Sequence, residues 1–451
     1  MKHPPIELKS ILFVAILSVM VSSCQLNKPE EANEEVSFDN PFTGSSPWPE
    51  IRKQRLQKLL PLAMDATNID AWVIICRENN NDPIAHHIGG ENAGGTAVFL
   101  FHKTEEKFTS TVFSPIGEAT ALADLKIHGN VIPVERGASA ISQAAEFIKS
   151  KNFKNIAINS SNENELADGL SYTQRKTLEE ALGNHAEKLV SSDALVYEFL
   201  AIKLPSEVEI MAKAAQLTSD WQYEAYAQII PGKSTDADIA KFLKKKMELY
   251  GVTDAWSPDQ NPNVNSGEDR GHSHATEKVI MPGDVIQIDF GIRVFDMWVS
   301  DIQRFAYVLR DEEEVAPDSV QFYFESSIGG NRIALEAMKP GILGYQVDKA
   351  QRDWMEERGS EYVMWSTGHP VGYVAHDIGP NLGGGMLADP TTRPAAMKPL
   401  KEGMLFAFDG FHAWKLPNGG TKTMSVEETA VVTSDGARYL IEPQKELILI
   451  K

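Results

Sequence analysis

Acidic side chains interrupt apolar, strand-like segments in the second half of this 451-residue chain. Asp289 lies in "VIQIDFG", Asp301 in "WVSDIQRFAYVL" and Asp409 in "GMLFAFDGF". A carboxylate that is removed from water on the face of a sheet is costly unless a positive charge compensates for it. One such acid could be an accident of a strand end, but several together indicate bound cations.

Histidines and further acids add to this set of donors. His369 and His376 lie in the glycine-punctuated stretch "STGHPVGYVAHDIGP", and Glu427 and Glu428 lie in "MSVEETAVVTSDG". Adjacent residues of a strand face opposite sides, so only one of the two glutamates can point inward. Four carboxylates and one imidazole suit Mn²⁺, Fe²⁺, Co²⁺ or Zn²⁺ better than a closed thiolate site does. The sequence therefore predicts a site for two divalent cations.

The order and context of these residues resemble the pita-bread metallopeptidases: aminopeptidase P, prolidase and methionine aminopeptidase. That family presents an Asp in a "D-x-G" strand, an Asp in "S-D-I-x-R", a His, a Glu and a Glu, in this order. The matching positions are Asp289 in "IDFG", Asp301 in "SDIQR", His369 in "GHPVGYVAHD", Asp409 in "FAFDG" and Glu427 in "VEET". The resemblance runs from about Leu204 to the C-terminus. One departure is Asp409, which replaces the family's Glu and is one methylene shorter.

The resemblance implies a ligand set for two metal ions. Asp301 and Glu427 would bridge the ions, Asp289 would complete the shell of one ion, and His369 with Asp409 would complete that of the other. Mn²⁺ is the expected metal, with Co²⁺, Zn²⁺ or Fe²⁺ as alternatives.

The resemblance also implies a reaction and the groups that carry it. Asp409 would take a proton from the attacking water and pass it to the leaving amine. His272 and His376 match two further histidines of the family and would hydrogen-bond the scissile carbonyl or the oxyanion. The expected activity is a metallo-exopeptidase that removes an N-terminal residue preceding proline from a peptide.

Two alternatives remain open at this stage. One is an Xaa-Pro dipeptidase (prolidase), and the other is a catalytically silent, lipid-anchored binding protein with the same fold. In the silent case the acids would be structural charges paired with Arg270, Arg293 or Arg304. The sequence also leaves a monomer and a homodimer open as the assembly.

Two domains are expected to build this site. Alternating helical and strand patterns over residues 48–204 predict an α/β domain with a central sheet, which resembles weakly the N-terminal domain of creatinase and prolidase. Residues 205–451 are expected to form an α+β pita-bread catalytic domain with a curved antiparallel sheet. His86 and His87, in "NDPIAHHIGG", are expected in a loop where they are exposed or locally hydrogen-bonded, with a place above a cleft as the alternative.

The N-terminal segment predicts export and anchoring. The apolar run "ILFVAILSVMV" is too short to span a bilayer but suits a signal peptide, and "VSSC" resembles a bacterial lipobox with Cys24 as the acylated residue. Residues 1–24 are thus expected to be a lipoprotein signal, residues 25–47 a solvated tether, and the location a lipid-anchored one in the bacterial cell envelope. An ordinary secretory signal is the alternative.

The net charge limits the class of binding partner, and the cysteine content limits the possible thiol chemistry. A formal net charge of −20 argues against a nucleic-acid partner, because phosphate binding needs a basic face. Cys76, in "AWVIIC", is the second of two cysteines and is expected to be a packed, inert thiol.

Overall fold

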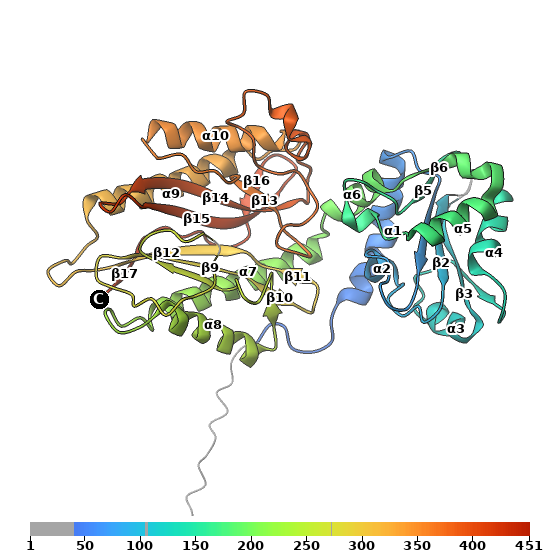
Figure 1. The fold of residues 1–451 in the computed structure, drawn as a ribbon, viewed down its shortest axis with the longest axis horizontal. Coiled ribbons are helices and arrows are strands. Elements are labelled where there is room, and N and C mark those ends of the chain that lie inside the picture. The colour runs from blue at the N-terminus through green and yellow to red at the C-terminus, as the bar shows by residue number, and fades with distance from the viewer. Residues whose placement is uncertain (1–39, 104–106, 272) are drawn as a thin grey trace, which may run out of the picture. The chain divides into compact units, whose positions relative to one another are not determined.

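The N-terminal part of the fold is an α/β layer built on a mixed sheet (Figure 1). In this computed structural model, residues 40–103, 107–271 and 273–451 are described. Pro41–Lys451 is one compact unit. The strand order of the first sheet is β4-β3-β2-β1-β5-β6. Its strands are β1 (Ala71–Cys76), β2 (Ala97–Lys103), β3 (Phe108–Pro115), β4 (Asn130–Val134), β5 (Ile156–Ile158) and β6 (Leu189–Ser191).

The inner strands of this sheet are apolar because helices cover both faces. Every residue of β1 is buried, and burial raises the pKa of the Cys76 thiol, as expected for an inert cysteine. The helices are α1 (Trp48–Ala66), α2 (Ala85–Ile88), α3 (Ile116–Asp124), α4 (Ala140–Lys149), α5 (Tyr172–Leu182) and α6 (Asp193–Ala201), with 3₁₀ turns η1 (Glu165–Ala167) and η2 (Gly183–Lys188). The predicted α/β fold of this region is confirmed.

The loop predicted for His86 and His87 is wrong, because both residues lie in the short helix α2. His86 is exposed, as expected, whereas His87 is buried. Its ring lies 4.7 Å from that of Tyr373, between centroids, so a contact from a distant part of the chain buries a segment that looked like a polar loop.

The second half of the chain forms a curved, mainly antiparallel sheet with the order β13-β14-β15-β12-β9-β8. Its strands are β8 (Asn263–Ser266), β9 (Val285–Phe290), β12 (Ile302–Val308), β13 (Gly368–Pro370), β14 (Leu405–Lys415) and β15 (Thr421–Val432), with β16 (Ala437–Tyr439) on β15 and β17 (Ile448–Ile450) on β12. Strands β7 (Thr253–Asp254), β10 (Ile292–Val294) and β11 (Trp298–Val299) form a separate small sheet. The α+β fold predicted for this half is therefore confirmed.

Four helices pack on this sheet: α7 (Pro205–Tyr226), α8 (Asp236–Tyr250), α9 (Asp318–Ala337) and α10 (Gly344–Glu357). Figure 1 shows α9 and α10 along β14 and β15, and α7 and α8 along β9 and β12. Helix α9 approaches β14 closely, because a Cβ at Gly410 would lie only 1.9 Å from the carbonyl oxygen of Ser327. Two short 3₁₀ turns, η3 (Pro390–Thr392) and η4 (Pro394–Met397), precede β14.

Among the described residues, no helix has the length and apolar character needed to cross a bilayer.

Candidate metal centre

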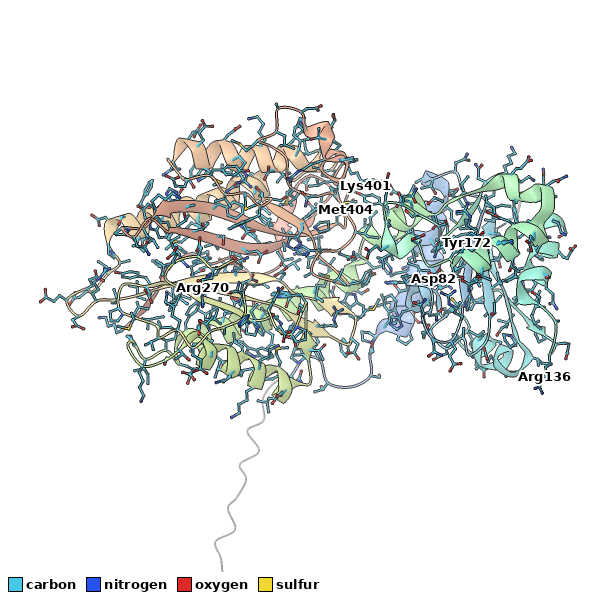
Figure 2. All side chains as sticks on the ribbon, in the orientation of Figure 1. Asp82, Arg136, Tyr172, Arg270, Lys401 and Met404 are labelled. Atoms are coloured by element: carbon cyan, nitrogen blue, oxygen red, sulfur yellow. The ribbon has the colours of Figure 1, made fainter. Side chains whose placement is uncertain are left out.

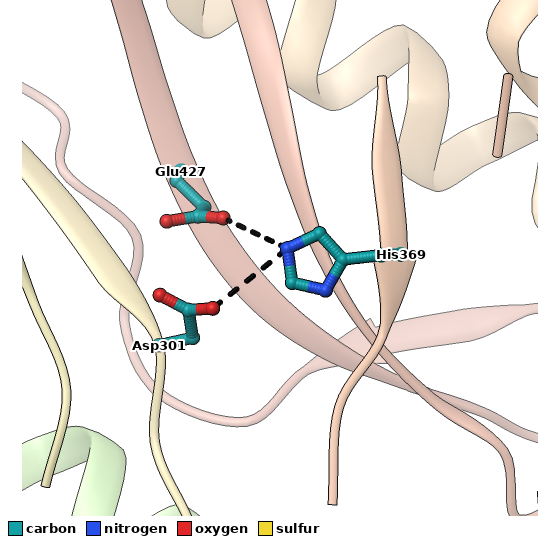
Figure 3. A group of neighbouring side chains, drawn as sticks. All are labelled: Asp301, His369 and Glu427. Carbon is teal, nitrogen blue, oxygen red and sulfur yellow. Dashed lines mark ion pairs between the residues drawn. The ribbon is translucent and has the colours of Figure 1, made fainter. Parts of the chain in front are cut away.

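Three of the predicted ligands meet in one place (Figure 3). His369 Nε2 lies 3.7 Å from Asp301 Oδ2 and 3.9 Å from Glu427 Oε1. One donor atom from each of these residues lies within 4.8 Å of the others. An acid-rich set with one imidazole is chemistry that a divalent transition ion can use.

The strand register places the other two predicted ligands on the same face of the sheet. Asp409 of β14 is directly opposite Glu427 of β15, Glu427 is opposite Gln303 of β12, and Gln303 is opposite Asp289 of β9. Directly opposed residues of antiparallel strands share a face, and Asp301 shares that of Gln303 because it lies two residues before it. We call the acids Asp289, Asp301, Asp409 and Glu427 the carboxylate row.

The carboxylate row is buried, and its members repel one another. All four side chains are at most 7% exposed. Burial raises the pKa of Asp301 well above its usual value, and the charges of Asp289 and Asp409 raise it further. Burial likewise raises the pKa of Glu427, followed by the charges of Asp301, Asp409 and Asp289.

One carboxylate oxygen of Glu427 has no hydrogen-bond partner among the described residues. Glu427 Oε2 is buried and accepts no hydrogen bond from any described residue. Buried charges in proteins are normally paired or coordinate metals. The donor chemistry, the burial and this oxygen together fit a divalent cation.

Ion pairing with the three arginines does not account for the row. Arg304 donates to both carboxylate oxygens of Glu428, at 2.9 and 3.0 Å, so Glu428 is the glutamate that faces away from the row. Arg270, labelled in Figure 2, donates to Asp236 at 2.8 Å. Arg293 donates to backbone carbonyls, one of them that of Tyr373 at 2.7 Å. The arginines of the ionic alternative are therefore engaged elsewhere.

The imidazole of His369 is oriented for ligation. Its Nδ1 lies 3.2 Å from the carbonyl oxygen of Pro370, which leaves Nε2 on the side of Asp301 and Glu427. A bond from the second ring nitrogen to a carbonyl is the usual way in which a metal-binding histidine is held. His376 lies beside it, with the two ring centroids 4.2 Å apart.

Two predicted residues lie outside the part of the chain that the structure describes. These are His272, assigned to the substrate carbonyl, and Cys24, assigned to lipidation.

A buried network holds the segment that carries His376. Glu207 accepts from Tyr373 Oη at 2.6 Å and from Arg55 Nη1 at 2.6 Å. Lys203 Nζ lies 2.9 Å from Asp377 Oδ2. Burial acts to raise the pKa of Glu207, but the nearby donors, Arg55 first among them, lower it below its usual value.

This network was not predicted from the sequence. Glu207 and Arg55 are 152 positions apart. Glu207 reads in the sequence as an ordinary acid in the first turn of a helix, and its side chain does accept from the backbone N–H of Leu204 at 2.9 Å. No local pattern distinguishes such a capping acid from one with distant partners.

Comparison with known proteins identifies the family. Residues 209–434 match metallopeptidase family M24. The chain belongs to this family. It is therefore a metallo-exopeptidase built on the pita-bread fold.

Individual relatives extend this likeness over the N-terminal region of the M24 chain. The chain is 26% identical to a Xaa-Pro dipeptidase of Pyrococcus horikoshii over 406 residues. This match covers 88% of this chain and 100% of the relative. The structure of an X-Pro aminopeptidase from Thermotoga maritima is similar with a TM-score of 0.64 at 22% identity, covering 86% of this chain and 100% of that one. Dipeptidase PepE from Mycobacterium ulcerans gives a TM-score of 0.65 at 21% identity, covering 90% and 100%. At this identity, the two solved structures support the fold alone.

Proposed function

We propose that this M24 enzyme hydrolyses the bond between an N-terminal residue and proline in peptides. The observation that carries the proposal is the carboxylate row, whose members Asp301 and Glu427 lie within 4 Å of the imidazole of His369. Curated relatives named Xaa-Pro dipeptidase support the proline-directed substrate class.

Five side chains would hold two divalent ions. Asp301 and Glu427 would be shared, with Asp289 on one side of the pair and His369 with Asp409 on the other, which is the order of their strands in the sheet. When bound, such ions supply Lewis-acid chemistry, lowering the pKa of a coordinated water and stabilising charge on the scissile carbonyl oxygen. Mn²⁺ is the metal we propose, with Co²⁺, Zn²⁺ or Fe²⁺ as substitutes.

Proton transfer falls to Asp409. Its carboxylate stands opposite Glu427 in the register, so it can accept a proton from the attacking water and donate it to the leaving amine. General acid–base catalysis of this kind contributes on the order of 10²- to 10⁴-fold to the rate. His376, beside His369, can donate a hydrogen bond to the oxygen on which negative charge develops.

The space beside His376 favours an aminopeptidase over a strict dipeptidase. His376 lines a cavity of about 520 Å³ together with Tyr373 and Arg293. A pocket of this size accommodates more than one amino-acid residue. The dipeptidase alternative draws support from the names of several relatives, and the two activities differ in whether a tripeptide is cleaved.

A peptide panel with controlled metal tests the proposal. We expect hydrolysis of Xaa-Pro dipeptides and of longer Xaa-Pro peptides, loss of activity in a chelator, and recovery on addition of Mn²⁺. Activity on dipeptides alone would favour the dipeptidase. Metal binding without hydrolysis of any peptide would contradict the proposal and favour the silent binding protein.

We also propose that the enzyme is a lipoprotein of the bacterial envelope, anchored through Cys24. The support is the sequence "VSSC" after a short apolar run. Labelling of the full chain with a radioactive fatty acid tests this, with Cys24→Ala as the matched control. Label that persists in Cys24→Ala would contradict the assignment.

A further inference from the structure

A small polar recess lies beside the carboxylate row, at the end of the sheet formed by β8. Asn263 is directly opposite Asp289, and Asn265 is opposite Gln287, so both asparagines lie on the face that carries the row. The recess has a volume of about 40 Å³. Its lining includes Asn263, Asn265, Gln303, Thr423, Ser425 and Trp365.

Two acceptor atoms in the recess are buried and unused. Asn263 and Asn265 are 2% and 1% exposed, and the Oδ1 atom of each has no hydrogen-bond partner among the described residues. The amide of Asn263 is oriented by its Nδ2, which donates to the carbonyl oxygen of Gly271 at 3.0 Å. Native proteins rarely leave buried acceptors unsatisfied, and a bound ligand is one reason for an exception.

Two other polar groups of the recess, those of Gln303 and Asp269, are already engaged. Gln303 Oε1 accepts from Gln287 Nε2 at 2.7 Å and from Ser425 Oγ at 3.0 Å. The carboxylate of Asp269 lies 3.3 Å from Lys422 Nζ, which offsets its charge. The recess therefore presents two unused neutral acceptors to a ligand, and these favour a hydrogen-bond donor.

The two ends of the row differ in the space that they offer. In the strand order of the sheet, β13, which carries His369, is at one end and β8 is at the other. Beside His369, the ring of His376 opens onto a cavity of about 520 Å³, whereas the β8 end offers only about 40 Å³. An exopeptidase that releases one residue needs a small, closed side for that residue and an open side for the remainder.

We propose that this recess binds the side chain of the substrate's N-terminal residue and selects a small hydrogen-bond donor: serine, threonine or asparagine. The inference rests on the proposed Xaa-Pro function and names the residue that precedes proline. A water molecule needs about 10–15 Å³ of such volume, so the recess holds roughly three water-sized groups and excludes aromatic or long side chains.

Threonine and valine provide the sharpest test, because they have the same shape and differ in one hydroxyl. The Mn²⁺-loaded enzyme is assayed on Thr-Pro and Val-Pro peptides of two and three residues. We expect kcat/KM to favour threonine by roughly 5- to 100-fold, the effect of leaving a buried polar group unpaired.

Asn265→Leu keeps the size of the side chain, removes one of the two acceptors and should lower the threonine-to-valine ratio toward one. Asn162→Leu, the same exchange at an exposed position, should keep the wild-type ratio. If Asn265→Leu does not fold, the ratio of the wild-type enzyme decides alone.

The outcomes separate this inference from the function on which it rests. Cleavage of both peptides with valine equal to or better than threonine overturns the recess assignment and leaves the Xaa-Pro function standing. Cleavage of no Xaa-Pro peptide by the metal-loaded enzyme overturns the proposed function, and the inference with it.

Discussion

The hydroxyl of Tyr373 tests how the segment that carries His376 is positioned. Its Oη donates to Glu207 Oε1 at 2.6 Å, and both side chains are buried. Hydrogen bonds to charged groups contribute about 1.5–3 kcal/mol to stability. Tyr373→Phe removes this bond and keeps the ring, while Glu207 retains its bond from Arg55 at 2.6 Å. The free energy of unfolding should therefore fall by about 1.5–3 kcal/mol.

The same substitution should slow the reaction more than it weakens substrate binding. Tyr373 is a positioning residue, because it acts through the segment that ends at His376. We expect kcat to fall roughly 10- to 100-fold, as small misplacements of a reacting group do, with bound metal and KM little changed.

Calorimetry, metal analysis and steady-state kinetics on Tyr373→Phe measure these effects. Tyr172→Phe is the matched control, since Tyr172 is 82% exposed and labelled in Figure 2. The reasoning is refuted if Tyr373→Phe matches both the wild type and this control in unfolding and in kcat. A loss of stability with unchanged kcat would leave Tyr373 a purely structural residue.

Three further substitutions probe buried charge elsewhere. Burial raises the pKa of Asp82 from 3.8 to about 6, so its protonated form stabilises the fold at low pH and this stability, about 3 kcal/mol, is lost as the pH rises through about 6. Unfolding at several pH values should show that Asp82→Asn lacks this loss. Glu427→Gln should raise the melting temperature of the metal-free protein and abolish the further rise that Mn²⁺ causes, whereas the exposed Glu446→Gln changes neither. Arg304→Met should cost about 3–5 kcal/mol by leaving Glu428 buried and unpaired, and adding Glu428→Gln should restore part of it.

The fold and the three residues that meet in the centre were largely predictable, because local patterns carry them. Strand alternation marks Asp289 and Asp301 as acids in apolar segments, and the order of motifs points to His369, Asp409 and Glu427. The register then places the four acids on one face of neighbouring strands. Their roles as ligands remain predictions.

The features that were missed depend on contacts between distant parts of the chain. His87 reads as part of a polar loop, yet it is buried against Tyr373. The unused acceptors of Asn263 and Asn265 follow from the pairing of β8 with β9. Neither residue lies in a pattern that a single sequence marks as unusual, since asparagine is common in loops and strand ends.

Metal content per chain tests the central claim most directly. Protein stripped with a chelator, dialysed against Mn²⁺ and analysed by mass spectrometry of its metals should bind two ions per chain. The combined variant Asp301→Asn and Glu427→Gln should bind none while remaining folded. Full hydrolysis of Xaa-Pro peptides by metal-free protein, or unchanged metal content in the combined variant, would contradict a centre built on the carboxylate row.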